Sequence, residues 1–147
     1  MARLNRPVAY EPTTATLDRL YIFSIRFESG MEVVKIGKSS GKSSLDRMLQ
    51  IQRDYFNKYR CTFICRIVRD RECEEAFKYE TALHSFFKEY RYTPKTAFSG
   101  STELFCISLD AAKEAYEYIL DNGIDSLKDF EYDPSGYKET EPDNLLF

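Results

Sequence analysis

The sequence predicts a small α/β protein of the α+β type, with a central mixed or antiparallel β-sheet that opens with a β-hairpin and is flanked by helices. Two runs rich in β-forming residues surround a Glu-Ser-Gly turn at residues 28–30, and two later segments repeat apolar residues at helical spacing. At 147 residues the chain can form one domain with a sizeable core. Its 15% aromatic content is more than a disordered chain carries.

The hairpin comprises predicted strands over residues 20–27 and 31–37. Tyr21 and Lys35 lie on these neighbouring strands, and we expect their side chains to share one face of the sheet. The loop that follows contains Gly-Lys-Ser twice. A phosphate-binding P-loop has four residues between its two glycines, but only three separate Gly37 from Gly41, so an NTPase is disfavoured.

A helix is predicted over residues 44–59, with Ser43 or Ser44 as its N-cap. Apolar and aromatic residues recur there at i, i+3, i+4 and i+7, which predicts a buried stripe. Arg47 falls on the opposite side of the helical wheel, away from that stripe. The stripe consists of Leu45, Met48, Leu49, Gln52, Tyr55, Phe56 and Tyr59.

Residues 61–68 form a predicted third strand, with Cys61 and Cys65 on one face as buried thiols. A zinc site is disfavoured, because His84 is the only histidine and the cysteine spacing matches no standard zinc motif. No apolar signal-peptide core precedes the fold, and no apolar run reaches the length of a membrane helix. These observations predict a cytoplasmic or nuclear protein with reduced cysteines, and the cytoplasm is the preferred compartment.

A second helix is predicted over residues 72–90, and Glu80 lies in the middle of its apolar side. A charged carboxylate in such a place costs several kcal/mol unless it meets a cation, a metal ion or hydrogen-bond donors. Glu80 therefore indicates either a structural ion pair, with Lys35 or Arg47, or a functional site. The apolar side consists of Cys73, Ala76, Phe77, Leu83, His84 and Phe87.

The rest of the chain predicts a loop over 91–101, a strand over 102–109 and a helix over 111–121. Asp110 is the expected N-cap of this helix, and Gly123 ends it. The predicted organisation is a polar leader at 1–17, a domain at 18–122 and an acidic, loosely ordered tail at 123–147. Residues 1–71 contain 14 Lys and Arg against 7 Asp and Glu, so the N-terminal half offers a basic face for phosphate groups.

Five short motifs, taken in order over residues 20 to about 118, resemble the GIY-YIG nuclease superfamily. The resemblance is to a divergent branch, frequent in phages and viruses, that has Lys-Ile-Gly in place of the second motif. The motifs are the hairpin tyrosine, Lys-Ile-Gly with a polar loop, an arginine on the first helix, Glu-x-x-Leu-His, and Glu-Leu-Phe. In this sequence they are Leu20-Tyr21-Ile22-Phe23, Lys35-Ile36-Gly37, Arg47, Glu80-Thr81-Ala82-Leu83-His84 and Glu103-Leu104-Phe105.

The resemblance implies a metal-dependent phosphodiesterase, a DNA endonuclease that uses Mg²⁺ or Mn²⁺. Glu80 would be the metal ligand, and Arg47 and Lys35 would stabilise charge on the phosphate. Arg47 and Glu80 would converge, from the two predicted helices, on the sheet face that carries Tyr21 and Lys35. Tyr21 would be the base or would orient a water, with its pKa lowered by Lys35 or the metal. His84 would either position a phosphate or water, or pack beside Glu80.

We expect Lys38, Lys42 and Arg53 to contact nucleic acid in the basic half of the chain. DNA is preferred over RNA as the partner, and the compartment would be the host-cell cytoplasm if a virus encodes the chain. A second copy of the chain and a protein bound to the acidic C-terminal region are the other expected partners. The alternatives to an endonuclease are an accessory or inhibitory binding module on the same scaffold, and a structural interaction protein.

Overall fold

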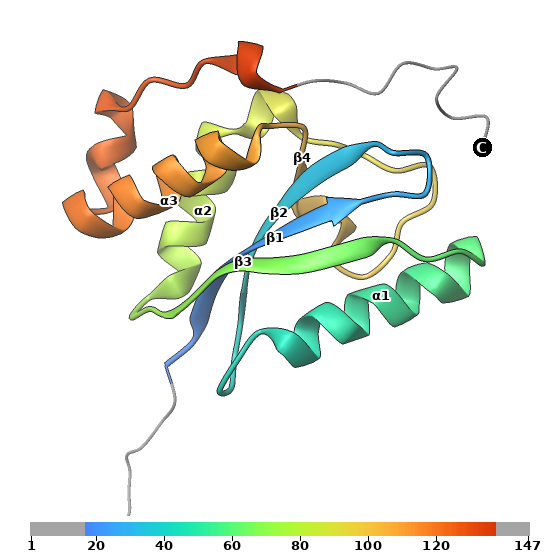
Figure 1. Cartoon of the computed structure of the whole chain (residues 1–147). Coiled ribbons are helices and arrows are strands. Elements are labelled where there is room, and N and C mark those ends of the chain that lie inside the picture. Colours follow the sequence, from blue (N-terminus) through green and yellow to red (C-terminus); the bar gives the residue numbers. More distant parts are fainter. Residues whose placement is uncertain (1–16, 138–147) are drawn as a thin grey trace, which may run out of the picture.

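The computed structural model describes residues 17–137, which form an antiparallel sheet with helices on both faces (Figure 1). The strands lie in the order β3–β1–β2–β4 and comprise β1 (Arg19–Arg26), β2 (Glu32–Ser39), β3 (Ile64–Glu72) and β4 (Leu104–Phe105). The α-helices are α1 (Leu45–Tyr59), α2 (Ala76–Phe86) and α3 (Leu109–Asn122). The α+β class and the opening hairpin are confirmed. Within this part of the chain, no helix is long and apolar enough to cross a membrane.

The hairpin register determines which side chains meet. Tyr21 is paired with Gly37 and Phe23 with Lys35, so side chains at these positions share one face of the sheet. That face is covered by α1, whose Ile51 and Tyr55 are buried against it. The opposite face, carrying alternate residues of the same strands, is covered by α2 and α3 (Figure 1). The prediction that Tyr21 and Lys35 point to one face is confirmed.

The buried stripe of α1 differs from the predicted one. Leu45, Leu49 and Phe56 are 44%, 44% and 47% exposed, whereas Ile51 and Tyr55 are buried. Large apolar residues lie on two flanks of this helix, so their spacing alone did not determine which flank faces the sheet. The prediction that Arg47 lies away from the core side is wrong, because Arg47 is one helical turn before Ile51 and half-buried.

The third strand begins at Ile64 rather than residue 61, which leaves Cys61 before it. Cys61 and Cys65 are free and half-buried, whereas we expected both to be buried. Helix α2 is shorter than predicted, because it begins after Glu75 in a left-handed conformation with φ of 59° and ends at Phe86. Phe77 is 53% exposed, so it does not belong to the apolar side.

Helix α3 is capped by Ser108, whose hydroxyl accepts a hydrogen bond from the Ala111 N–H at 3.1 Å, and not by Asp110 as predicted. The helix ends at Asn122 with Gly123 as its C-cap, as predicted. The expectation of a loosely ordered chain from residue 124 is wrong for 124–137. Leu127 is buried, and Phe130 and Tyr132 pack against the same core as α2 and α3. The remainder of the predicted tail (138–147) and most of the predicted leader (1–16) lie outside the described residues.

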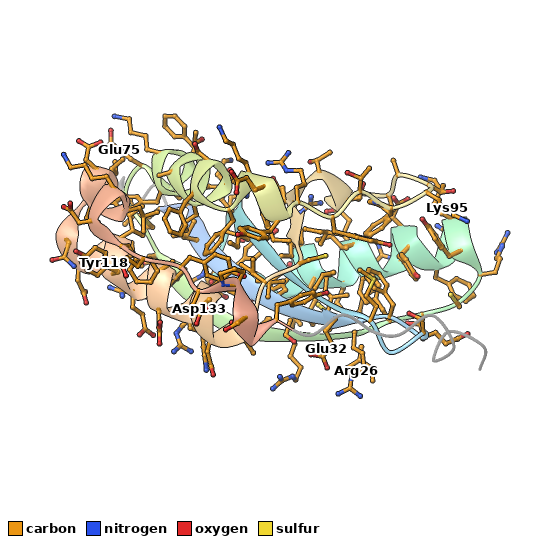
Figure 2. The ribbon with its side chains drawn as sticks, turned by 90° about the horizontal axis from the view of Figure 1, so that it is seen from above. Arg26, Glu32, Glu75, Lys95, Tyr118 and Asp133 are labelled. Atoms are coloured by element: carbon orange, nitrogen blue, oxygen red, sulfur yellow. The ribbon has the colours of Figure 1, made fainter. Side chains whose placement is uncertain are left out.

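Three further helices are 3₁₀-helices: Lys88–Tyr90 follows α2, Ser101–Glu103 directly precedes β4, and Ile124–Asp129 packs against α2 and α3. Another short turn of this kind spans Pro134–Gly136. Charged side chains project around the outside, and Arg26 and Glu32 pair across the hairpin at 3.2 Å (Figure 2). Both side chains of this ion pair are more than half exposed, so the pair is a surface contact.

Candidate active site

The candidate site lies where the sheet has an open edge. The pairing of β4 with β2 extends over only two residues of β2, Val34 and Lys35. On that side of β2, residues 36–39 have no strand partner among residues 17–137. Side chains from both faces of the sheet can therefore meet around this edge.

Glu80, His84 and Glu103 form a cluster at this edge. One potential ligand atom from each side chain lies within 4.8 Å of the others, and all three residues are half-buried. Glu80 and His84 are four residues apart on α2, which places them on one side of that helix. Glu103 comes from the 3₁₀-helix directly before β4. Two carboxylates and one imidazole therefore converge from different elements.

His84 is oriented by the backbone of β2. Its Nε2 lies 2.6 Å from the Ile36 carbonyl oxygen, and since a carbonyl only accepts, Nε2 carries the proton. Burial lowers the pKa of His84, which favours the neutral ring. Nδ1 is then the ring nitrogen with a lone pair for a metal ion.

The carboxylates of the cluster repel one another. Burial raises the pKa of Glu80 to about 7, and the negative charge of Glu103 adds to the shift. Burial alone would also raise the pKa of Glu103, but the nearby Lys35 ammonium outweighs it and lowers that pKa. Bringing a divalent cation to these oxygens would relieve the repulsion, so the donor set fits a metal ion.

Lys35 and Tyr21 approach the cluster from the α1 side. The Lys35 side chain is fully buried and forms an ion pair with Glu103. Burial lowers the pKa of Lys35, and Glu103 opposes that shift. The Lys35 Nζ also lies 5.5 Å from the centroid of the Tyr21 ring, so these two residues form one unit beside the carboxylates.

The proposed role of Tyr21 as a base is not supported by its surroundings. Tyr21 is fully buried and stacks on Phe23 with ring centroids 3.9 Å apart. Burial raises its pKa above the usual value, whereas the role of a base required Lys35 or a metal ion to lower it. The desolvation of a phenolate at this site outweighs the nearby positive charges, so Tyr21 stays protonated at neutral pH.

Arg47 reaches the same region from α1. Its Nη1 donates to Ser99 Oγ at 2.9 Å and to Gln50 Oε1 at 3.0 Å. Gly100 lets Arg47 and Lys35 approach each other, because a Cβ atom there would lie 3.2 Å from Arg47 Nη2 and 3.0 Å from Lys35 Nζ. The structure thus brings Arg47 beside Lys35, with hydrogen bonds that fix its guanidinium.

We expected the two helices to converge on one face of the sheet, and that expectation is wrong. Helix α1 and helix α2 cover opposite faces (Figure 1). Glu80 nevertheless acts electrostatically on Lys35, and its carboxylate lies close enough to Glu103 for the charge of Glu103 to raise the pKa of Glu80. Glu103 lies at the open edge, where it pairs with Lys35 from the α1 side and lies beside Glu80 and His84 from the α2 side. Glu103 therefore connects the residues of the two faces.

A polar groove of about 650 Å³ adjoins this edge on the α1 side. Its lining includes Lys38, Arg47 and Arg53, together with the acidic Asp18 and Asp46. Two of the three residues expected to contact nucleic acid, Lys38 and Arg53, therefore lie in one groove beside Arg47. Lys42, the third of those residues, is exposed but is not part of the groove lining.

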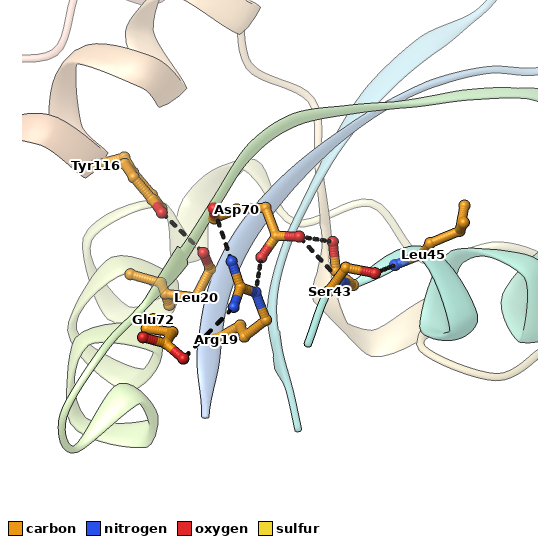
Figure 3. A network of polar contacts seen from close by, with 8 residues as sticks. Arg19, Leu20, Ser43, Leu45, Asp70, Glu72 and Tyr116 are labelled. Atoms are coloured by element: carbon orange, nitrogen blue, oxygen red, sulfur yellow. Dashed lines mark hydrogen bonds and ion pairs between the residues drawn. The ribbon is translucent and has the colours of Figure 1, made fainter. Parts of the chain in front are cut away.

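Asp70 on β3 fixes the start of α1 (Figure 3). Its carboxylate accepts hydrogen bonds from Arg19 Nε at 2.6 Å and from the Ser44 N–H and hydroxyl at 2.9 and 2.8 Å. Burial alone would raise the pKa of Asp70, but these hydrogen bonds outweigh it and lower the pKa. Because Ser44 directly precedes α1, this contact determines where Arg47 enters the site.

Sequence reasoning gave no role to Glu103 or Asp70. Glu103 belonged to the Glu-Leu-Phe motif, and its position before a short strand was the signal that could have placed it at a sheet edge. Asp70 lies in a run of four charged residues at 69–72, which belongs to β3 although we expected that strand to end at residue 68. Their partners lie 68 and 51 residues away in the sequence, so no local pattern reveals them.

The comparison with known proteins identifies a family but no close relative. No curated protein sequence and no solved structure matches the chain. Residues 19–120 match the T5orf172 domain, a phage-type, nuclease-associated domain. The match begins at β1, extends into α3 and includes Glu80, His84 and Glu103, the residues of the acidic cluster. Because it covers more than half of the sequence, the chain belongs to the T5orf172 domain family.

Proposed function

We propose that this chain is a divalent-metal-dependent DNA endonuclease of the GIY-YIG type. The observation that carries the proposal is the convergence of Glu80, His84 and Glu103 beside Arg47 at the open edge of β2. Membership of a nuclease-associated family supports the same reaction class. The nearby groove, which contains Lys38 and Arg53, supports a phosphate backbone as the substrate.

Glu80, Glu103 and His84 Nδ1 would hold the metal ion. Carboxylate oxygens suit Mg²⁺ and Mn²⁺, and one imidazole nitrogen favours Mn²⁺. When bound, the metal would polarise the phosphate and lower the pKa of a water molecule. Glu103 is positioned for this task by Lys35, and His84 by the Ile36 carbonyl oxygen.

The remaining residues bind and orient the substrate. Arg47 carries a fixed positive charge toward the cluster, suited to a non-bridging phosphate oxygen as negative charge develops there. Tyr21 keeps its proton, so its contribution is a hydroxyl donor and a ring that packs beside Lys35. In this proposal Tyr21 orients groups in the site and does not act as a phenolate base.

A second candidate function is a nucleic-acid-binding accessory or inhibitory factor that does not cleave. The ion pair between Lys35 and Glu103 favours it, because the ammonium already neutralises one carboxylate of the cluster. In that case no metal ion would be bound beside Glu80, and the groove would bind nucleic acid without cleaving it. The two candidates differ in one measurable property, which is whether the cluster binds a divalent ion.

The test compares nicking of supercoiled plasmid DNA in Mg²⁺, Mn²⁺ and EDTA with direct Mn²⁺ binding by calorimetry. Glu80→Gln and Glu103→Gln should each abolish nicking and weaken Mn²⁺ binding at least tenfold, because each removes a charged ligand. Glu114→Gln is the matched control, since Glu114 is exposed on α3 outside the site. Mn²⁺ binding equal in all four proteins would reject the metal site. DNA binding without metal binding or nicking would favour the second candidate.

A further inference from the structure

Arg91 is positioned by the sheet although it lies in a segment without regular secondary structure. The Cys106 N–H donates to the Tyr90 carbonyl at 2.7 Å, and the Tyr92 N–H donates to the Leu104 carbonyl at 2.8 Å. Residues 90–92 thus pair along the outer side of β4, with Arg91 opposite Phe105. The backbone at Arg91 is therefore held as in a strand, two residues from Glu103 across that pairing.

The Arg91 side chain lies close to the acidic cluster. Its guanidinium carbon is 5.5 Å from the centroid of the Phe105 ring, and that ring is 5.3 Å from the ring of His84. Phe105 belongs to the core on the α2 side of the sheet. Arg91 is therefore on the α2 side of the edge, whereas Arg47 reaches the edge from the α1 side.

The charge of Arg91 is available to a ligand. Arg91 is exposed and forms no ion pair with any carboxylate of residues 17–137, whereas Arg19, Arg26 and Arg69 all do. A hollow of about 360 Å³ opens beside it, and its lining includes Tyr90, Tyr132 and the acidic Glu89. Stacking on Phe105 fixes the direction of the guanidinium without neutralising it.

We propose that Arg91 binds a phosphate of the nucleic-acid strand on the far side of the acidic cluster from Arg47, so that the strand crosses the open edge of β2. The inference rests on the proposed function, because it takes the cluster as the place where one phosphate lies. Carboxylates repel the flanking phosphates of a strand, so a strand that passes over them needs a cation on each side. Arg47 supplies one cation, and Arg91 supplies the other.

Arg91→Gln tests this contact, with Arg66→Gln as the matched control. Arg66 is also exposed and unpaired within residues 17–137, but it lies on β3 at the opposite edge of the sheet. Binding of a fluorescent DNA duplex is measured by anisotropy in EDTA, between about 50 and about 200 mM KCl. EDTA removes cleavage from the readout, so the result does not depend on activity.

Arg91→Gln should weaken binding several-fold at low salt and reduce the slope of log K against log salt by about 0.9, the value for one phosphate contact on duplex DNA. Arg66→Gln should leave the slope at its original value. An Arg91→Gln slope equal to that of the unmodified protein would overturn the inference but leave the proposed nuclease intact. A reduced slope in a protein that never nicks plasmid DNA would reject the nuclease and support the contact. Failure of the unmodified protein to bind DNA would reject both.

Discussion

Substituting Gly37 by alanine tests how Tyr21 is held in the site. A Cβ atom at Gly37 would lie 2.5 Å from the Tyr21 hydroxyl oxygen, 2.7 Å from Tyr21 Cζ and 3.0 Å from Glu103 Oε1. The Tyr21 ring cannot move away easily, because it is fully buried and stacked on Phe23. Lys-Ile-Gly therefore ends in glycine for a steric reason, which is that Tyr21 lies across this residue of the neighbouring strand.

Two opposing effects determine the size of the change. In a backbone conformation that alanine tolerates, replacing glycine stabilises a protein by about 0.4–1 kcal/mol through the unfolded state. Overpacking in a core that cannot relax destabilises by about 1–3 kcal/mol. Contacts of 2.5 and 2.7 Å with one immobile ring place Gly37→Ala at the upper end of that range. The gain through the unfolded state offsets part of this cost, so we expect the free energy of unfolding to fall by about 2 kcal/mol.

Urea denaturation of Gly37→Ala, Tyr21→Phe and the double variant measures the effect and its cause. Removing the hydroxyl relieves the 2.5 Å contact but not the 2.7 Å contact, so Tyr21→Phe should recover at least about 0.5 kcal/mol of the loss. Gly136→Ala combined with Tyr21→Phe is the control, because a Cβ at Gly136 would meet only Ser108, at ordinary van der Waals distances of 3.5 and 3.6 Å. A Gly37→Ala protein as stable as its parent, or zero coupling to Tyr21→Phe, would refute this account.

Three other changes have defined outcomes. In EDTA, Glu80→Gln should raise the free energy of unfolding at pH 8 by about 1–2 kcal/mol, because burial and Glu103 raise the pKa of Glu80 to about 7. This gain should vanish near pH 4, where Glu80 is protonated in both states, and a constant gain in pH-dependent urea melts would contradict it. Asp70→Asn should lower the free energy of unfolding by about 2 kcal/mol at pH 7. Because the folded protein lowers the pKa of Asp70, this loss should shrink as the pH falls below about 4. Equal losses at pH 7 and below about pH 4 would disprove the ionic contact with Ser44. Lys35→Met should destabilise by about 3 kcal/mol in EDTA, and thermal melts should show a smaller loss in Mn²⁺; an unchanged loss would indicate that the carboxylates hold no metal.

Much of the fold could be predicted from the sequence because its signals are local. Alternation of side chains on both strands gave the hairpin and placed Tyr21 and Lys35 on one face. Glu80 could be recognised as exceptional because a single helix period places it among apolar residues. These features depend on spacings of two to four residues, which the sequence displays directly.

The misjudged parts of the site depend on contacts between distant segments. Because α1 carries apolar residues on two flanks, its sequence does not show which flank faces the sheet or where Arg47 points. The contacts of Tyr55 with Phe63 and Phe98 determine this orientation. The pKa of Tyr21 depends on complete burial, which no neighbour in the sequence indicates. The approach of Arg47 and Glu80 from opposite faces of the sheet could not be inferred from the order of the elements, because it depends on the edge that the short β4 leaves on β2.

The pairing of Lys35 with Glu103 has a consequence for the order of folding. These residues are 68 positions apart, whereas β1, β2 and β3 form their mutual contacts within residues 19–72. A chain leaving the ribosome from its N-terminus can therefore assemble a three-stranded sheet before Glu103 has been synthesised. Completion of the carboxylate cluster therefore requires a residue that is synthesised after all three of these strands, whereas the pairing of the strands does not.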